Sequence, residues 1–166
     1  ICLLLLHIIP VLNAAGEVTP NDVYTQTFQI NEEVKLLKHF FNIDEVLQTP
    51  EIKAVLLPRH TWQKTYEILH KINILRQKVG LPFIAVPSRE PTQEVIPLHI
   101  YEQALRILTE LNLLKFYLGI QEKITPPPPF SGKTITDNFN LLNHSPYQLD
   151  LLNGAAFNPS AVFAQA

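Results

Sequence analysis

The chain has 166 residues, of which 46% are hydrophobic, and its net charge is −2. This length suffices for one modest hydrophobic core and excludes two well-formed domains. Lys and Arg are interspersed with Asp and Glu, so the chain lacks the basic stripe of a nucleic-acid-binding protein, and we expect no nucleic-acid partner.

The first element, residues 1–15, is an apolar run that ends in the small residues Ala14 and Ala15. No initiator methionine or basic segment precedes the run, so we interpret it as a secretory signal peptide that is incomplete at its N-terminus. The run is too short to span a bilayer, and we expect no membrane insertion of the mature chain. The predicted localisation is periplasmic or secreted. An uncleaved anchor and a buried helix are the alternatives.

Residues 16–166 are predicted to form one helical repeat domain with a period of 38 to 39 residues. A copy typically opens with a proline, has an aromatic residue four positions later and closes on Gly or Asn followed by an aliphatic residue. The repeats start near residues 19, 57, 96 and 134, and a truncated one starts near 158. The fourth copy lacks the proline.

Apolar residues in each copy recur in alternating steps of four and three, which is the spacing of a heptad seam. The third copy shows the seam most clearly, at Ile100, Ala104, Ile107, Leu111, Leu114 and Leu118. Neighbouring aromatic residues widen the apolar stripe, as in a helical bundle. We expect Ile68, Leu75, Ile107 and Leu114 to lie in one core.

The predicted helices have start and stop signals. The first two are expected at about 20–41 and 58–79. Thr19 with Asp22, and Thr134 with Asp137, have the spacing of a capping box. Each of the three long helices is expected to close on a left-handed residue followed by an aliphatic one, namely Asn42-Ile43, Gly80-Leu81 and Gly119-Ile120.

The fold class is therefore all-α, with long proline-containing linkers between the helices. We expect an up-and-down helical bundle, and the alternative is a stack with one helix per repeat. The linkers are long enough for either arrangement. In the fourth copy Pro146 interrupts the pattern, which predicts two shorter helices at about 136–143 and 146–153.

No catalytic, cofactor-binding or metal-ligating residue is predicted. His60 and His99 share one position of the repeat, but metal sites usually need three or four converging ligands. Ser131-Gly132-Lys133-Thr134 resembles the end of a phosphate-binding loop but lacks its first glycine. The only cysteine, Cys2, lies in the signal, so the mature chain has no thiol chemistry. We therefore expect that the protein is not an enzyme and has no cofactor.

An aromatic row is the most regular feature with functional potential, and the candidate binding surface consists of Tyr24, Trp62, Tyr101 and Phe139. If the helices are parallel, these rings could form a ladder that stacks on a sugar or an extended peptide. Packing in the core is the other interpretation. The predicted function is a non-catalytic binding or scaffolding module with an unknown protein or peptide partner; the alternative is the ligand-sensing helical bundle of a larger receptor.

Overall fold

The computed structural model describes residues 17–86 and 94–155. The predicted signal peptide and the truncated fifth copy lie outside the described residues. Within these ranges the chain forms five helices and no strand, and the helices pack against one another as a bundle. The predicted all-α fold class is confirmed.

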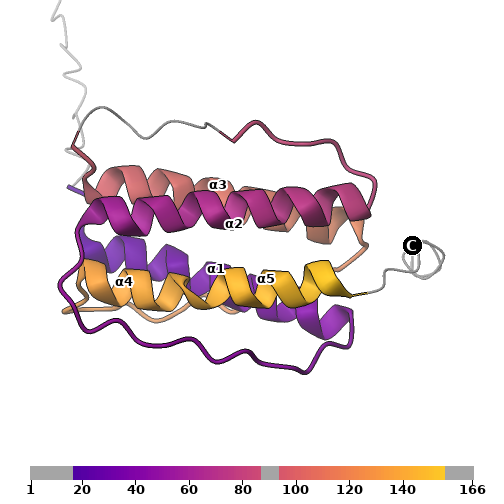
Figure 1. The fold of residues 1–166 in the computed structure, drawn as a ribbon, viewed down its shortest axis with the longest axis horizontal. Helices are drawn as coiled ribbons and strands as arrows, with labels where there is room; N and C mark the ends of the chain where they lie inside the picture. The colour runs from indigo at the N-terminus through magenta and orange to yellow at the C-terminus, as the bar shows by residue number, and fades with distance from the viewer. Residues whose placement is uncertain (1–16, 87–93, 156–166) are drawn as a thin grey trace, which may run out of the picture.

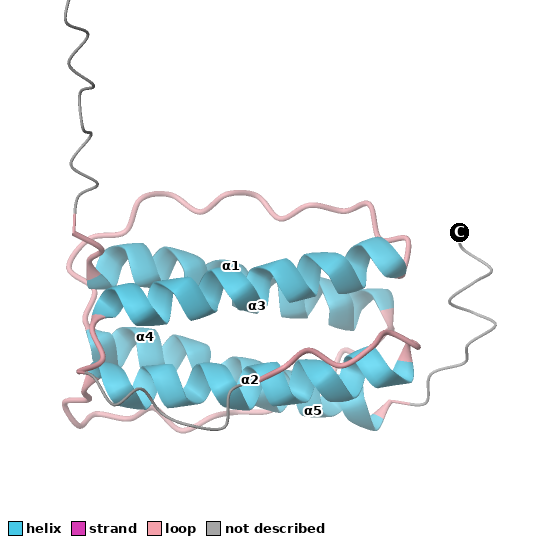
Figure 2. Ribbon diagram, turned by 90° about the horizontal axis from the view of Figure 1, so that it is seen from above, coloured by secondary structure: helices cyan, strands magenta, loops and turns pink. Residues whose placement is uncertain are grey.

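Three helices are 21 residues long and begin at a proline: α1 (Pro20–Phe40), α2 (Pro58–Lys78) and α3 (Pro97–Tyr117). Two shorter helices, α4 (Ile135–Leu142) and α5 (His144–Gly154), follow one another along the bundle in the place of a fourth long helix (Figure 2). Pro146 lies in the first turn of α5, where its missing N–H costs no helical hydrogen bond. The predicted split of the fourth copy is confirmed.

All the helices run in the same direction (Figure 1). Their N-terminal ends meet in a hydrophobic cluster that contains Val23 of α1, Trp62 of α2 and Ile100 of α3, and Ile135 of α4 packs against it. Both α1 and α2 pack against α3 and against the α4–α5 pair, which closes the bundle. The helices are therefore parallel neighbours around a common core.

The expectation of an up-and-down bundle is thus wrong. Antiparallel neighbours need only short connections across one end of a bundle, whereas parallel neighbours need a connection that returns along the helix. A helix of this length is roughly 30 Å long, and an extended linker of similar residue number can cover more than that distance. The alternative, one-helix-per-repeat arrangement has the correct helix direction, but the helices surround one core and do not form a row.

The buried residues occupy the predicted heptad positions. Ile68, Leu75, Ile107 and Leu114 are fully buried in one cluster, as expected. The same alternation of four and three residues continues through α4 and α5, despite the break between these helices. The fully buried residues at this spacing are Asn138, Leu142, Ser145, Leu149 and Leu152. The short helices therefore complete the core as a fourth long helix would.

The first and third linkers are extended and lie on the helices. In the first linker (41–57), the backbone N–H of Ile52 donates to Asn140 Oδ1 and its carbonyl accepts from Asn140 Nδ2, both at 2.9 Å. In the third linker (118–134), Phe130 contacts the rings of Tyr24 and Phe28 on α1, with centroid separations of 4.8 and 5.5 Å. The Asn140 amide thus bonds the backbone of the first linker as a neighbouring strand would, whereas aromatic packing holds the third linker on α1.

The helix ends follow the sequence signals. Asn42, Gly80 and Gly119 have φ values of 54°, 82° and 72°, the left-handed conformation of a Schellman close. At the other end, Thr134 N–H donates to Asp137 Oδ2 at 2.7 Å, and Asp137 N–H donates to Thr134 Oγ1 at 3.2 Å. The predicted capping boxes at Thr19 and Thr134 are both present.

Replacing Asp137 with alanine is expected to destabilise the protein at neutral pH by roughly 0.5–1 kcal/mol, as loss of a helix cap does. The hydrogen bond from the Thr134 side chain, followed by that from its backbone, lowers the pKa of Asp137 below 3.8. The stabilisation is therefore fully present above this ordinary value and disappears as the pH falls through the lowered one. In urea unfolding, the free energy of unfolding should differ between wild type and variant at neutral pH, and this difference should vanish in strong acid. An equal difference at both pH values would contradict the capping role.

Candidate functional site

The four residues of the predicted aromatic row lie in the N-terminal part of the bundle, but they do not form a ladder. Trp62 is 4% exposed and packs on Tyr66, with ring centroids 4.2 Å apart. Tyr24 contacts Phe130, and Lys133 Nζ lies 4.3 Å from its ring centroid. Lys64 lies over Phe139, and Tyr101 packs against the cluster that contains Trp62. Among the described residues, none of these four rings stacks on another.

Because Trp62 is the only tryptophan and is buried, the protein should fluoresce like a shielded indole. We expect weak quenching by acrylamide and no change on addition of glycans or proline-rich peptides. Strong quenching of the free protein that one of these ligand classes relieves would contradict the packing role.

His60 and His99 cap helices. His60 Nδ1 accepts a hydrogen bond from Leu57 N–H at 3.1 Å, and His99 Nδ1 accepts one from Ile96 N–H at 3.3 Å. Asp22 and Asp137 accept the equivalent bond from Thr19 and Thr134 in α1 and α4. These histidines therefore stand three residues after the N-cap residue, as Asp22 and Asp137 do. The described residues contain no group of three or more His, Cys, Asp or Glu that could hold a metal ion.

Three cations lie buried at one position of the long helices, 18 residues after the opening proline: Lys38, Arg76 and Lys115. Each donates to a backbone carbonyl of the linker that follows its helix. The acceptors are the carbonyl of Glu45 for Lys38, that of Pro82 for Arg76 at 2.9 Å, and that of Glu122 for Lys115 at 3.3 Å. These hydrogen bonds thus hold the first residues of each linker against the bundle.

The three cations differ in their second partner, which comes from the neighbouring helix. Lys115 pairs with the buried Glu33 at 2.5 Å, and Arg76 pairs with Glu110 at 2.6 Å. Lys38 Nζ donates instead to the neutral Gln148 Oε1 at 2.5 Å. Among the described residues, no carboxylate lies within ion-pair distance of Lys38.

Lys38 also lines a pocket of about 420 Å³. We call it the α1–α5 pocket because it lies between α1, the first linker and the α4–α5 pair. Its lining residues are Phe28, Asn31, Glu32, Lys35, Lys38, Val46, Leu141, His144 and Gln148. Phe28, Val46 and Leu141 form apolar walls, whereas the amides of Asn31 and Gln148 and the Lys38 ammonium are buried polar groups.

The polar groups of the pocket are held in position. Asn31 Nδ2 donates to the Leu141 carbonyl at 2.7 Å, and Asn31 Oδ1 accepts from Ser145 Oγ at 2.7 Å. Lys35 and Glu32 form an ion pair at 2.6 Å. His144 Nδ1 lies 2.6 Å from Thr49 Oγ1 of the first linker. The pocket is therefore formed from fixed side chains of three segments.

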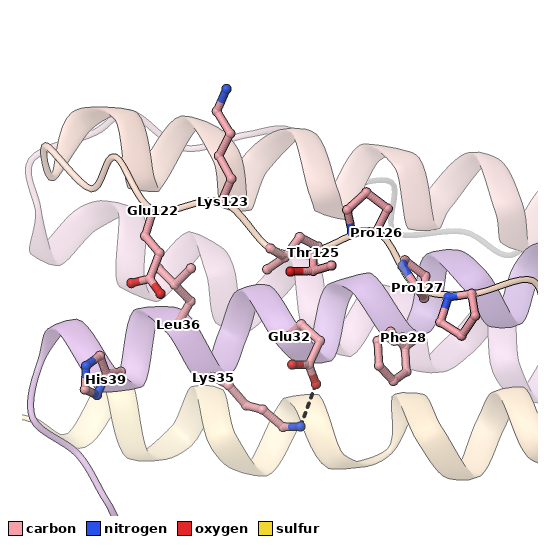
Figure 3. A pocket seen from close by; sticks show the side chains of 12 residues that line it. Phe28, Glu32, Lys35, Leu36, His39, Glu122, Lys123, Thr125, Pro126 and Pro127 are labelled. Carbon is pink, nitrogen blue, oxygen red and sulfur yellow. Dashed lines mark hydrogen bonds and ion pairs between the residues drawn. The ribbon is translucent and has the colours of Figure 1, made fainter.

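A second groove of about 540 Å³ lies on the same helix, between α1 and the third linker (Figure 3). Pro126, Pro127 and Pro128 form one wall, and Phe28, Glu32 and Lys35 belong to both this groove and the α1–α5 pocket. The outer face of α1 is thus hollowed on both sides of the Lys35–Glu32 pair. A different surface, the outer face of α3, exposes the apolar side chains of Leu98, Leu105, Leu113 and Phe116.

The heptad pattern does not reveal the buried cations, because it consists of apolar residues. Their signal is nevertheless in the sequence: a cation recurs 18 residues after each opening proline, inside the last turns of an otherwise amphipathic helix. Gln148 could also have been found, since it stands 13 residues after Ile135, as Glu33 and Glu110 stand 13 residues after Pro20 and Pro97.

None of the helices in the described parts of the chain combines the length and hydropathy needed to cross a membrane. No protein-family model, curated protein or solved structure matches this chain.

Proposed function

We propose that the protein is an exported, non-catalytic binding module whose ligand occupies the α1–α5 pocket. The observation that carries this proposal is a buried ammonium, that of Lys38, in the wall of a pocket that Phe28, Val46 and Leu141 also line with apolar side chains. Ligand sites are typically concave and mostly apolar, with a few fixed polar groups that orient the ligand. The volume of about 420 Å³ is within the range of small-molecule sites.

The ionisable groups of the pocket suit binding better than catalysis. Glu32 and Lys35 pair with each other, and His144 is engaged with Thr49. Lys38 donates to two fixed oxygen atoms. A general acid or base must be able to reach a proton of the substrate, and a pair of such groups must converge on it. Charges that are already paired instead provide a constant electrostatic environment for a ligand.

The repeat interpretation is also part of this proposal. In successive helices, the buried cations, the capping residues and the core residues each stand at the same distance along the chain from the first residue of the helix. We infer that one helix and its returning linker form one repeat unit of 38–39 residues. Export is supported by the apolar run of residues 1–15 and its small C-terminal residues.

The proposal can be tested with two matched variants of the first linker. Val46 is 64% exposed and lines the pocket, whereas Val55 is 93% exposed and lies on the same linker away from it. Val46→Trp should obstruct the pocket, and Val55→Trp should leave it open. The measurement is the rise in melting temperature caused by a library of anionic, neutral and cationic small molecules, since a ligand of the folded state stabilises it.

We expect some members of the library to stabilise the wild type and Val55→Trp, but not Val46→Trp. Stabilisation of all three proteins by the same compounds would place the ligand elsewhere. A library that stabilises none of them would contradict the small-molecule function.

A further inference from the structure

We propose that the α1–α5 pocket binds a small carboxylate with an apolar body, and that Lys38 holds the carboxylate. This inference rests on the proposed function and adds the chemical class of the ligand. It follows from a comparison of three equivalent buried cations within the chain, together with the lining of the pocket.

The comparison identifies a missing negative charge. At the position that faces each cation from the neighbouring helix, Lys115 has Glu33 and Arg76 has Glu110, but Lys38 has Gln148. Gln148 has the shape of glutamate without its charge. The bundle therefore neutralises two of its three buried cations with its own carboxylates and leaves the third with neutral partners.

Lys38 also has a donor available. A lysine ammonium has three N–H donors, and two of them serve Glu45 O and Gln148 Oε1. The side chain is 5% exposed, so water has little access to the third. Burial lowers the pKa of Lys38, and the negative charges of Glu45 and Asp44 oppose this effect only in part. An anion that enters the pocket would stabilise the charged form of Lys38 and accept its third hydrogen bond.

The rest of the pocket determines the size and polarity of the ligand. Glu32 compensates the charge of Lys35 at 2.6 Å, which leaves Lys38 as the lysine of the lining that pairs with no carboxylate. One such cation suits a monoanion better than a phosphate dianion. The side chains of Phe28, Val46 and Leu141 offer apolar contact to the remainder of the ligand.

The test uses three probes of similar shape and different charge: phenylacetate, phenylacetamide and phenethylamine. Calorimetric titration measures their dissociation constants for the whole protein. We expect phenylacetate to bind more tightly than phenylacetamide by roughly tenfold to hundredfold, the range for one hydrogen bond to a buried charge. Phenethylamine should bind least tightly, because its ammonium would approach Lys38.

Two variants show whether Lys38 is responsible. Gln148→Glu supplies the missing carboxylate and should abolish the preference for phenylacetate while the apolar contacts remain. Glu110→Gln is the matched control, because it removes the carboxylate beside Arg76, outside the lining of the pocket, and should leave the preference unchanged. Lys38→Met should abolish the preference as well, and circular dichroism shows whether this variant folds.

The carboxylate could belong to a free acid or to the C-terminus of a peptide. Acetylphenylalanine and its amide imitate the latter, and comparison of their affinities with those of the phenylacetyl pair identifies the better source. Equal affinities for acid and amide in the wild type, or a preference that persists in Gln148→Glu, would overturn the inference but leave a small-molecule pocket. Failure of every probe and every library compound to bind would overturn the proposed function itself.

Discussion

Replacing Lys115 with methionine is expected to lower the free energy of unfolding by about 3–5 kcal/mol, because it leaves a buried carboxylate without its partner. Glu33 and Lys115 are both buried, and their charged atoms are 2.5 Å apart. Methionine fills a similar volume, so the loss would come mainly from the charge. Urea unfolding should show a lower midpoint with little change in slope.

Two controls isolate the buried pair. Lys35→Met breaks the exposed pair with Glu32 on α1 and should cost about 0–1 kcal/mol. The double variant Lys115→Met with Glu33→Leu removes both charges and should recover most of the stability, since hydrophobic residues can replace a buried pair. If Lys115→Met lowers the free energy of unfolding no more than Lys35→Met does, the Lys115–Glu33 pair is hydrated in solution. Lys38, Arg76 and Lys115 would then not be equivalent buried cations.

Truncating Ile107 to alanine should destabilise the protein by about 2–5 kcal/mol. Ile107 is fully buried on α3 and belongs to the core cluster that also contains residues of the other helices. Removing three carbon atoms there loses their transfer free energy and leaves a cavity that the surrounding helices can fill only in part. The free energy of unfolding in urea is again the measurement.

Leu105→Ala is the matched control, because this leucine lies two residues earlier on the same helix and is 42% exposed. Surface substitutions of this kind usually change stability by about 0.5 kcal/mol or less. Equal effects of the two substitutions would mean that the predicted phase of the helix is wrong.

The helices could be predicted from the sequence because several local signals coincide at each of them. Pro20, Pro58 and Pro97 begin helices, Asn42 and Gly119 close them, and the heptad spacing between identifies the buried face. All these signals act within one helix and its two ends. The prediction therefore needed no knowledge of how the helices are connected.

Helix direction could not be predicted in this way. A heptad seam has the same spacing whether its neighbour is parallel or antiparallel, and linkers of this length permit both. In the structure, Asn140 and Thr136 of α4 accept hydrogen bonds from the backbone of the first linker at Ile52 and Leu56 and hold the linker along the bundle. Such pairings join residues far apart in the chain and have no local sequence signature.

The candidate pocket depends on the same long-range placement. Gln148 stands 13 residues after Ile135, as Glu33 and Glu110 stand 13 residues after Pro20 and Pro97. The difference between amide and carboxylate indicates a site only once the fold places Lys38 beside Gln148. The aromatic row, by contrast, was visible at once because its members share one offset. Its rings do not stack on one another in the structure: Tyr24 contacts Phe130 of the third linker, whereas Trp62 packs on Tyr66 of its own helix.

If the ligand binds between α1 and the α4–α5 pair, backbone amide chemical shifts of the isotopically labelled protein will change at that place. Phenylacetate, phenylacetamide and phenethylamine would each be titrated into the wild type. We expect concentration-dependent changes in chemical shift at Val46, Leu141 and Gln148, largest with phenylacetate, and no change at Leu105 or Phe116 on the outer face of α3. Changes in chemical shift along that face of α3, with none around the α1–α5 pocket, would contradict binding in the pocket.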